Sequence, residues 1–355
     1  MKFHVVSLPH TNTLKSYSSC AFTQKVIRFC DMMKSLGHEV VLYSGKENEA
    51  PCDEHVACAS KKDRLRMCGN KHYTEADWGN PLWQKYNNKV IEEMEKRIGQ
   101  KDFICLIGGY AQKPIADHFK NNISVEFGIG YSGVFANYKV FESYAWMHTV
   151  YGSKSNGDAS TLDGQWYDTV IPNQFFQDDF APKETEEEKY ALYVGRLIDR
   201  KGYQIAQDVC KYKGIKLKLA GPGKDRGNGY GEFVGEVSPK QRATLMKNAI
   251  ALFAPTKYIE PFGTVTIEAM SYGTPVISSD WGAFTETVQN GVHGYRCRTF
   301  NDFVEALDKV ENLDREEIKN YAHSKFSMPV VAKQYEKYFD DLYQLWGEGW
   351  YTIKN

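Results

Sequence analysis

IALFAPTKYIEPFGTVTIEAMSYGTPVIS, residues 250–278, is the stretch that most clearly indicates the fold of this chain. An apolar run is followed by a loop with two prolines, a helical stretch over residues 264–272 and a second apolar run over residues 275–278. A buried strand, a helix and a second buried strand in this order form the unit from which parallel sheets are built. We therefore expect a parallel sheet with helices on both of its faces.

The same alternation of strand and helix extends through both halves of the chain. The other expected strands cover residues 2–8, 39–43, 103–107, 123–127, 168–171, 190–194 and 215–220. The other expected helices cover residues 22–36, 81–98, 114–120, 140–150, 203–212, 239–248 and three stretches at the end, the last over 328–345. Gly37 should end the first helix and Ser238 should cap a later one. Residues 45–79 are expected to be irregular.

Length and composition favour a globular protein with two domains. The chain has 355 residues, 42% of them hydrophobic and 25% charged, and its formal net charge is -1. We expect two Rossmann-like, doubly wound α/β domains that face a cleft, over residues 1–172 and 173–327, with a final helix over 328–355 that returns to the first domain. The sequence contains no run of 18 apolar residues and no signal-peptide pattern, so a cytoplasmic location is expected.

Two cations follow the strand expected at residues 190–194. Gly195-Arg196 comes directly after it, and Lys201-Gly202 lies five residues further on. A guanidinium and an ammonium at the start of a helix are suited to holding a diphosphate. The alternative interpretation is a surface helix with two solvated cations, and this feature alone does not separate the two.

Two carboxylates bracket the start of the helix expected at residues 264–272. Glu260 lies in the preceding loop and Glu268 lies one turn beyond Thr264, on the same helical face. The free amides at Gly263 and Thr264 and the positive end of the helix dipole form an anion site. The alternative, an N-terminal helix charge with an exposed carboxylate, is weakened by the Glu-Pro-Phe-Gly run.

With these elements in place, the sequence resembles the retaining family-4 glycosyltransferases of the GT-B fold. The resemblance rests on residues 193–197, Lys201-Gly202, residues 219–223, Glu260-x7-Glu268 with Ala269-Met270, residues 273–277, Glu286, residues 291–295, and the hinge-like Ile171-Pro172-Asn173. It covers residues 171–297, and the order and spacing of so many elements make it specific.

The resemblance implies transfer of a sugar from a nucleotide diphosphate sugar, with retention at the anomeric carbon. Arg196, Lys201 and Glu260 would be the catalytic residues, two on the diphosphate and one on the sugar hydroxyls. The donor would further contact Gly195, Gly221, Gly235, Val237, Phe262, Gly263, Thr264, Val265 and, through its ribose, Glu268. The expected donor is a UDP- or GDP-sugar, and no metal or other cofactor is expected. The leaving phosphate oxygen would take the proton of the incoming hydroxyl.

The acceptor site is expected on the N-terminal domain, where the sequence is less informative. The expected acceptor-binding residues are His10, Ser18, Glu126, Tyr131 and His148. The first loop, residues 9–20, lacks the Gly-Gly pair of many family members and offers hydroxyls such as Thr11 and Thr13 instead. The acceptor could be a glycan, a lipid-linked molecule, a small molecule or a hydroxylated base in DNA. The DNA alternative depends on a basic patch that could contact phosphates, formed by Lys61, Lys62, Arg64, Arg66 and Lys71. The competing interpretation is that these are solvated charges in a loop.

Three further alternatives remain open on the sequence alone. Cys52, His55, Cys58, Cys68 and His72 could bind zinc, although their spacing matches no common zinc motif and favours an unliganded surface segment. A nucleotide-sugar 2-epimerase has the same architecture and binds the same donor. A non-catalytic sugar-nucleotide sensor would need only the binding half of the site. The oligomeric state is open as well.

Overall fold

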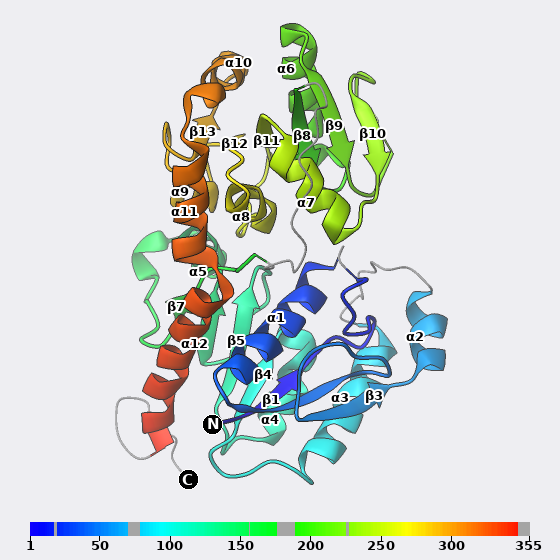
Figure 1. Cartoon of the computed structure of the whole chain (residues 1–355). Helices are drawn as coiled ribbons and strands as arrows, with labels where there is room; N and C mark the ends of the chain where they lie inside the picture. Colours follow the sequence, from blue (N-terminus) through cyan, green and yellow to red (C-terminus); the bar gives the residue numbers. More distant parts are fainter. Residues whose placement is uncertain (18–19, 70–78, 156, 176–188, 225–226, 347–355) are drawn as a thin grey trace. The chain divides into compact units, whose positions relative to one another are not determined.

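The chain folds into two compact units, shown in Figure 1. The computed structural model describes residues 1–17, 20–69, 79–155, 157–175, 189–224 and 227–346. Unit 1 comprises Met1–Glu142, Val150–Ile171 and Ala332–Asn355, and unit 2 comprises Ser143–Thr149 and Pro172–Val331. Unit 2 therefore takes a short segment from within the first half of the sequence, and unit 1 takes the end of the chain.

Unit 1 is built on a seven-stranded, fully parallel sheet with the order β3-β2-β1-β4-β5-β6-β7. Its strands are β1 (Lys2–Val6), β2 (Glu39–Gly45), β3 (Glu54–Ala59), β4 (Phe103–Leu106), β5 (Ser124–Ile129), β6 (Tyr138–Phe141) and β7 (Thr169–Val170). The direction of the strand order reverses between β1 and β4. In such sheets ligands bind beyond the carboxyl ends of the strands at this reversal.

Helices pack on both faces of this sheet. They are α1 (Ala21–Ser35), α2 (Lys61–Cys68), α3 (Pro81–Met94), α4 (Lys113–His118), the end of α5 (Tyr144–Gly152) and most of α12 (Met328–Tyr343), with 3-10 turns at η1 (Gly109–Gln112), η2 (Ala159–Thr161) and η5 (Gln344–Trp346). One face buries Val41, Ile104 and Leu106 against Tyr86 and Val90 of α3. The first helix ends as expected, with Gly37 at a φ of 78° directly after it.

The other face of this sheet is closed by aromatic rings from α1 and from α12. Phe339 of α12 is fully buried, and its ring centroid lies 4.7 Å from that of Phe3 and 4.9 Å from that of Phe103. Phe29 of α1 stacks on Phe127 at 4.3 Å. Burial of a large aromatic ring contributes several kcal/mol, so these contacts hold the C-terminal helix on unit 1.

Unit 2 contains a six-stranded parallel sheet with the order β10-β9-β8-β11-β12-β13. Its strands are β8 (Tyr190–Val194), β9 (Lys216–Ala220), β10 (Glu232–Gly235), β11 (Ala251–Ala254), β12 (Val276–Ser279) and β13 (Gly294–Cys297). Its helices are α6 (Tyr203–Lys213), α7 (Pro239–Asn248), α8 (Thr264–Ser271), α9 (Phe284–Thr287), α10 (Phe300–Lys309) and α11 (Arg315–Phe326), with η3 (Asp199–Lys201) and η4 (Val310–Asn312).

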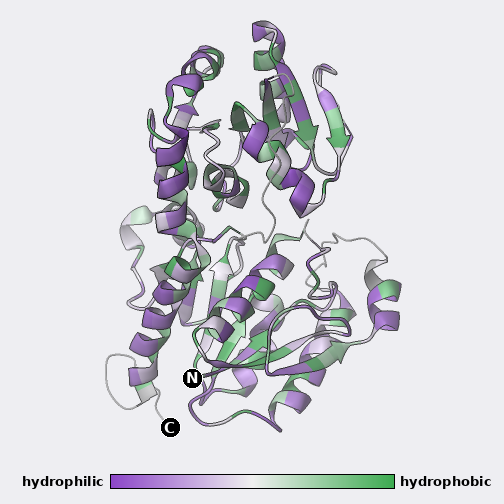
Figure 2. Cartoon of the chain, viewed as in Figure 1, coloured by the Kyte–Doolittle hydropathy of each residue, from purple (hydrophilic) through white to green (hydrophobic). Residues whose placement is uncertain are grey.

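Alternate residues of the central strands of unit 2 enter two different cores. Ala191 and Tyr193 pack with α6 and α10, whereas Tyr190 and Leu192 pack with α7 and α8. This is the period-two alternation of a strand buried on both faces, and Figure 2 shows the hydrophobic strands between more polar helix surfaces. The expected fold class, two doubly wound parallel-sheet domains, is therefore confirmed.

Several expected elements were wrong in detail. Residues 45–79 are not all irregular, because β3 and α2 lie within them. The helix expected over residues 140–150 is two elements, the strand β6 followed by α5. The strands β10 and β13 were missed. Four strands were therefore missed, and three of them, β3, β10 and β13, lie at an edge of their sheet. An edge strand has one side toward solvent, so its apolar pattern is weaker.

Candidate donor site

The expected donor residues lie at the carboxyl ends of four neighbouring strands of unit 2. Gly235 ends β10, Gly221 follows β9, and Gly195 follows β8. Backbone hydrogen bonds tie these ends together, from Gly195 N to Ala220 O at 2.9 Å and from Gly221 N to Gly235 O at 2.8 Å. Because the strands are adjacent and parallel, the loops that follow them open on one edge of the sheet.

Gly202 brings the loop after β8 against the loop after β11. Its φ is 70°, and a Cβ added to it would lie 1.9 Å from the carbonyl oxygen of Pro255. A second contact between the same loops runs from Lys257 N to Arg200 O at 2.9 Å. Only glycine permits this approach, which places the cations of one loop beside the carboxylate of the other.

Lys201 and Glu260 form an ion pair across these two loops. The Nζ of Lys201 lies 2.8 Å and 3.1 Å from the two carboxylate oxygens of Glu260. The side chain of Glu260 is 10% exposed and that of Lys201 is 22% exposed. Charge-assisted hydrogen bonds from a cation fix the orientation of a carboxylate beside it. The structure thus brings together two of the three residues expected to be catalytic.

Arg196, the third expected catalytic residue, is half-buried in the same region. Burial and the charge of Glu260 raise the pKa of Tyr193, while the charge of Arg196 lowers it. Burial and Glu260 also raise the pKa of Tyr258, which the charges of Arg200 and Arg196 lower. Charges that act on the same phenol groups are close in space, so the cations and Glu260 occupy one neighbourhood.

Helix α8 begins at the same edge of the sheet with its N-terminus uncapped by a side chain. Gly263 occupies the N-cap position with a φ of 78°, and no side chain there accepts a hydrogen bond from the first turn. The amide of Thr266 donates to Gly263 O at 2.9 Å, which leaves the amides of Thr264 and Val265 at the start of the helix, and with the helix dipole they attract an anion. Thr264 is half-buried, and its Oγ1 accepts a hydrogen bond from Asn173 Nδ2 at 3.2 Å.

The remaining expected donor residues fall into two groups. Val237 and Val265 are half-buried, in the loop between β10 and α7 and in the first turn of α8. Phe262 is instead 2% exposed and packs in the core with Ile267 and Phe284. Phe262 was expected to bind the donor, but its side chain faces the hydrophobic interior, where it packs against α8, and so it is not available to a ligand.

Glu268 has a partner that the sequence did not reveal. Arg242 of α7 approaches it with Nε at 3.3 Å from Oε2 and an η nitrogen at 3.4 Å from Oε1. Helix α7 is positioned by a capping box between Ser238 and Gln241, which confirms the expected N-cap. Arg242 is 26 residues away from Glu268, so no local pattern could have indicated the pair.

A segment from the first half of the sequence also joins unit 2. Ser143 Oγ donates to the carbonyl oxygen of Pro261, the neighbour of Glu260, at 2.7 Å. Glu286, a residue of the family motif, accepts hydrogen bonds from the backbone nitrogens of Tyr144 and Ala145 at 2.9 Å and 2.7 Å. A carboxylate at the N-terminus of a helix stabilises it, so Glu286 fastens the start of α5.

The residues expected to bind the acceptor lie in different environments. Glu126 is fully buried and accepts hydrogen bonds from the amides of Phe135 and Ala136, both at 2.8 Å, and from the Tyr131 hydroxyl at 3.1 Å. Burial raises the pKa of Glu126. The carboxylate of Glu126 is therefore enclosed within unit 1 and is not exposed to an acceptor, as its expected binding role would require. Tyr131 is half-buried, with its hydroxyl engaged by Glu126.

The two histidines proposed for the acceptor site differ in environment. His10 is 7% exposed, its Nδ1 has no hydrogen-bond partner among the residues that the structure describes, and burial lowers its pKa to about 4. It is therefore neutral near pH 7. His148 is exposed on α5, within the segment that belongs to unit 2. Ser18 lies outside the described residues.

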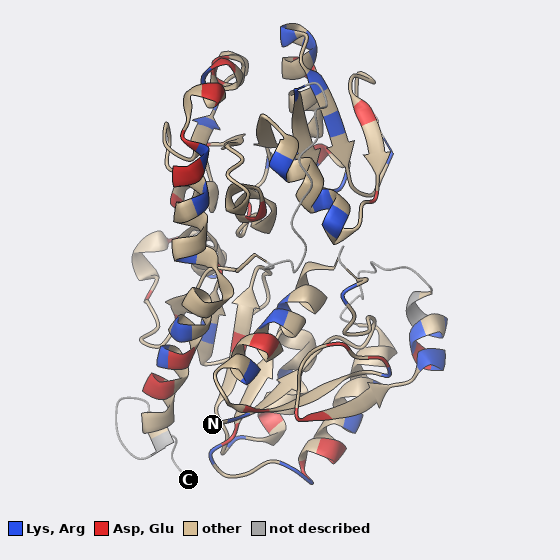
Figure 3. Cartoon of the chain, viewed as in Figure 1, with Lys and Arg blue, Asp and Glu red and all other residues tan. Residues whose placement is uncertain are grey.

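The other features singled out in the first domain are mostly structural. Thr11 and Thr13 were expected to offer hydroxyls to a ligand. Instead, the hydroxyl of Thr11 forms a hydrogen bond with that of Thr23 at 2.6 Å, and the hydroxyl of Thr13 donates to that of Ser44 at 2.9 Å. The basic residues 61–66 lie on α2 rather than in a loop, as Figure 3 shows. Lys61, Lys62 and Arg66 are exposed there, whereas Arg64 is buried and Lys71 lies outside the described residues.

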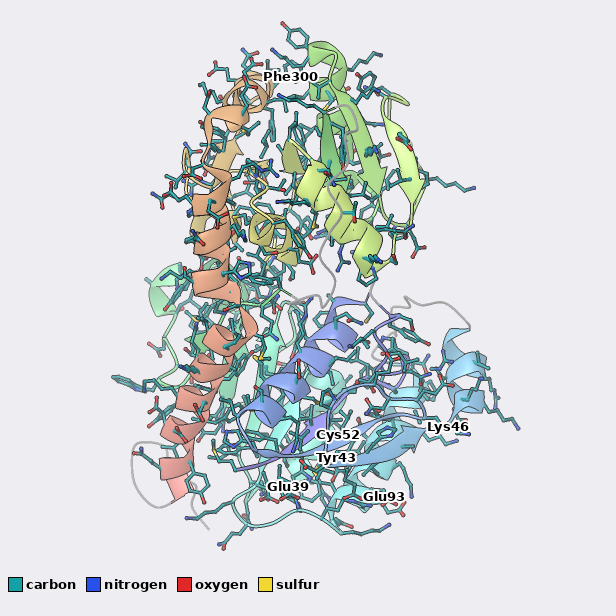
Figure 4. All side chains as sticks on the ribbon, in the orientation of Figure 1. Glu39, Tyr43, Lys46, Cys52, Glu93 and Phe300 are labelled. Atoms are coloured by element: carbon teal, nitrogen blue, oxygen red, sulfur yellow. The ribbon has the colours of Figure 1, made fainter. Side chains whose placement is uncertain are left out.

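The cysteine and histidine cluster does not converge on a metal among its described members. His55 Nε2 contacts Ser44 Oγ at 2.9 Å and Gly45 O at 3.0 Å, and Cys58 is buried in the core against α3. Cys52, labelled in Figure 4, has its sulfur 3.6 Å from Asn48 Nδ2. No three His, Cys, Asp or Glu residues are grouped as metal ligands in the described parts of the chain. His72 and the side chain of Cys68 lie outside them.

No described helix is long and apolar enough to cross a lipid bilayer.

Comparison with protein families supports the interpretation of unit 2. Residues 174–325 match the family described as glycosyl transferases group 1. The probable sucrose-phosphate synthase of Thermosipho melanesiensis is 30% identical to this chain over 193 residues, which cover 47% of this chain and 45% of that protein. The chain thus matches somewhat less than half of the length of this relative.

Comparison with solved structures supports the fold of the whole chain. AviGT4, a glycosyltransferase involved in avilamycin A biosynthesis, superposes with a TM-score of 0.67 at 20% identity, covering 98% of this chain and 99% of that chain. Alr3699/HepE of Anabaena, solved in complex with UDP-glucose, superposes with a TM-score of 0.64 at 13% identity, covering 96% of this chain and 100% of that chain. At these identities the likeness shows the fold, which is GT-B.

Proposed function

We propose that this chain, a GT-B protein whose residues 174–325 match the group 1 glycosyl transferases, transfers a sugar from a nucleotide diphosphate sugar to an acceptor hydroxyl. The observation that carries the proposal is the Lys201–Glu260 ion pair beside the uncapped start of α8. Cations and free amides suit a diphosphate, and a carboxylate suits the hydroxyls of the sugar attached to it.

Each part of the donor has a matching group in unit 2. Lys201 and Arg196 neutralise the diphosphate together with the first amides of α8, while Glu260 accepts hydrogen bonds from the sugar. Glu268 accepts them from the ribose diol and is held by Arg242. The diphosphate competes with Glu260 for Lys201, whose three N–H donors allow it to serve both partners.

The reaction that we propose retains the anomeric configuration and uses no metal ion. The bond from the anomeric carbon to the phosphate oxygen breaks, and the acceptor oxygen bonds that carbon from the same face. The acceptor proton passes to the departing phosphate oxygen, so no side chain need act as a general base. The main catalytic task is then to stabilise the negative charge that develops on the diphosphate, which Arg196, Lys201 and the amides of α8 perform.

Donor binding is tested first. Thermal unfolding and titration calorimetry with UDP-glucose and GDP-mannose, each with and without EDTA, should show stabilisation by one of them that EDTA leaves unchanged. A ligand at about a hundred times its dissociation constant stabilises by roughly 2.7 kcal/mol. Lys201→Ala should abolish this response. Lys211→Ala, on α6 and outside the site, is the matched control. If no nucleotide sugar binds, the proposal is wrong.

Product analysis then separates transfer from the alternative functions. The donor that binds is incubated alone and with candidate acceptors, and the products are followed by NMR. A glycosyltransferase forms a glycoside with the anomeric configuration of the donor, and Glu260→Gln should lose this activity. An epimerised nucleotide sugar would favour the 2-epimerase, and binding without turnover would favour the sensor. Activity on DNA would fall steeply with salt, whereas activity on a neutral acceptor would not.

A further inference from the structure

Two successive cations of η3, Arg200 and Lys201, lie against one aromatic ring. The guanidinium carbon of Arg200 is 4.0 Å from the centroid of the Tyr258 ring, and the Nζ of Lys201 is 5.1 Å from it. Both distances lie within the range of a cation–π interaction, which is stronger where the groups are partly desolvated. Arg200 is exposed, whereas the side chain of Lys201 is only 22% exposed, so the contact with Lys201 is the better shielded from water.

The ring belongs to a residue whose main chain is fixed. Tyr258 is half-buried in the loop between β11 and α8, and the sequence motifs assign no role to it. Its carbonyl oxygen accepts a hydrogen bond from Trp281 Nε1 at 3.1 Å. The ring is therefore attached to a backbone that holds its position independently of the two cations.

The backbone of η3 is fixed to the same loop. Lys257, which precedes Tyr258, donates its amide to Arg200 O at 2.9 Å. Gly202, directly after η3, packs against the carbonyl of Pro255 in this loop. These contacts bring the main chain of each cation next to the ring. They leave the long side chains of arginine and lysine with many rotamers, so the backbone alone does not place the charged ends.

The two partners of the Lys201 ammonium act differently on its charge. Glu260 pairs with the ammonium at 2.8 Å, so a diphosphate must compete with this carboxylate. The ring of Tyr258 has no formal charge, and it attracts the ammonium through the negative face of its π-system. The ring therefore restrains the ammonium without neutralising it.

We propose that the ring of Tyr258 is a positioning element of the donor site, which holds the ammonium of Lys201 where the diphosphate of the donor meets it. This inference rests on the proposed function and adds a residue to its site. An ammonium that is restrained before the donor arrives loses less rotamer freedom on binding, and this raises the affinity for the diphosphate. The effect is confined to the phosphates, because the ribose meets Glu268 in the proposed site.

The ring and the hydroxyl of Tyr258 are tested separately. Tyr258→Leu removes the ring and keeps an apolar side chain, so the affinity for the nucleoside diphosphate should fall about threefold to thirtyfold, the range of a cation–π interaction. The affinity for the nucleoside should stay unchanged, because it carries no phosphate. Tyr258→Phe keeps the ring and should bind the diphosphate as the wild type does. Tyr258→Met is a second variant without a ring, for use if Tyr258→Leu does not fold.

The experiment uses the full chain and the nucleoside diphosphate, UDP or GDP, whose glucose or mannose derivative binds the wild-type protein. Calorimetry gives the affinity for the diphosphate, NMR titration gives the weaker affinity for uridine or guanosine, and thermal unfolding gives the stability of each variant. Tyr230→Leu is the matched control. It removes a half-buried tyrosine whose hydroxyl donates to Ile215 O at 3.0 Å, directly before β9 and so at the other end of this strand from the donor site.

Weaker binding of the diphosphate in Tyr258→Leu, with wild-type binding in Tyr258→Phe and Tyr230→Leu and an unchanged affinity for the nucleoside, supports the inference. Wild-type affinity for the diphosphate in Tyr258→Leu would overturn it. An equal loss for diphosphate and nucleoside would show a merely structural role, and an equal loss in Tyr258→Phe would assign the effect to the hydroxyl; either result would overturn it too. Failure of the wild-type protein to bind any nucleotide sugar would instead refute the proposed function, so the two failures are distinguishable.

Discussion

Replacement of His10 by Phe should remove a large part of the acid sensitivity of unit 1. Burial lowers the pKa of His10 from 6.5 to about 4, so the folded protein binds fewer protons there than the unfolded chain between these two values. Stability therefore falls as the pH drops below 6.5. At pH 4.5 this one group should cost about 2.5 kcal/mol relative to pH 7, at 1.36 kcal/mol per pKa unit.

Two measurements check this prediction. NMR titration of the wild type should show one imidazole that stays neutral at pH 5 and is missing from the His10→Phe spectrum. Urea unfolding of both proteins at pH 7 and pH 4.5 should show a smaller loss of stability in the variant. Trp83→Phe, which alters the ring that His10 contacts, adds no titrating group and should keep the wild-type pH dependence. Parallel pH profiles for the wild type and His10→Phe would refute the reasoning.

Two further predictions concern the donor site. Gly263→Ala forces a side chain onto a φ of 78° and places its Cβ 2.6 Å from the Phe284 ring, so the start of α8 must shift and UDP affinity should drop at least tenfold. Gly214→Ala has a similar φ of 66° in open space, so it should cost only the backbone strain of about 1–2 kcal/mol and bind UDP normally; equal UDP affinity in the two variants would contradict the role of α8. Arg242→Gln leaves Glu268 without its cation, and calorimetry should show about tenfold weaker UDP binding, whereas unchanged or tighter binding would show that Arg242 does not orient the ribose partner.

The fold was predictable because its central strands are buried on both faces. β1, β4, β8 and β11 are short, nearly continuous apolar runs, and each is followed by a loop and a helix with its own period. The strands missed at the sheet edges are less completely buried than these, and β10, for example, contains no fully buried residue. Tertiary pairing, and not local propensity, forms these edge strands.

The donor site was predictable where its residues are close in the sequence. Glu260, Gly263 and Glu268 lie within one loop and one helix, so helical geometry alone places them on a common face. The acceptor residues were less predictable, because their environment depends on distant segments. Glu126 was expected to bind the acceptor, yet amides nine and ten residues later enclose its carboxylate.

The sequence by itself determined which of the central elements form and which glycines and charges follow each strand. Both depend on local features, namely the spacing of apolar residues and the backbone conformations that the turns require. Only the tertiary structure decided which charges meet. Lys201 and Glu260 are 59 residues apart, and Arg242 and Glu268 are 26 apart. Both pairs arise from the order of strands in the sheet and the close packing of loops at its edge. A side chain's partner depends on that three-dimensional arrangement, which no short-range period encodes.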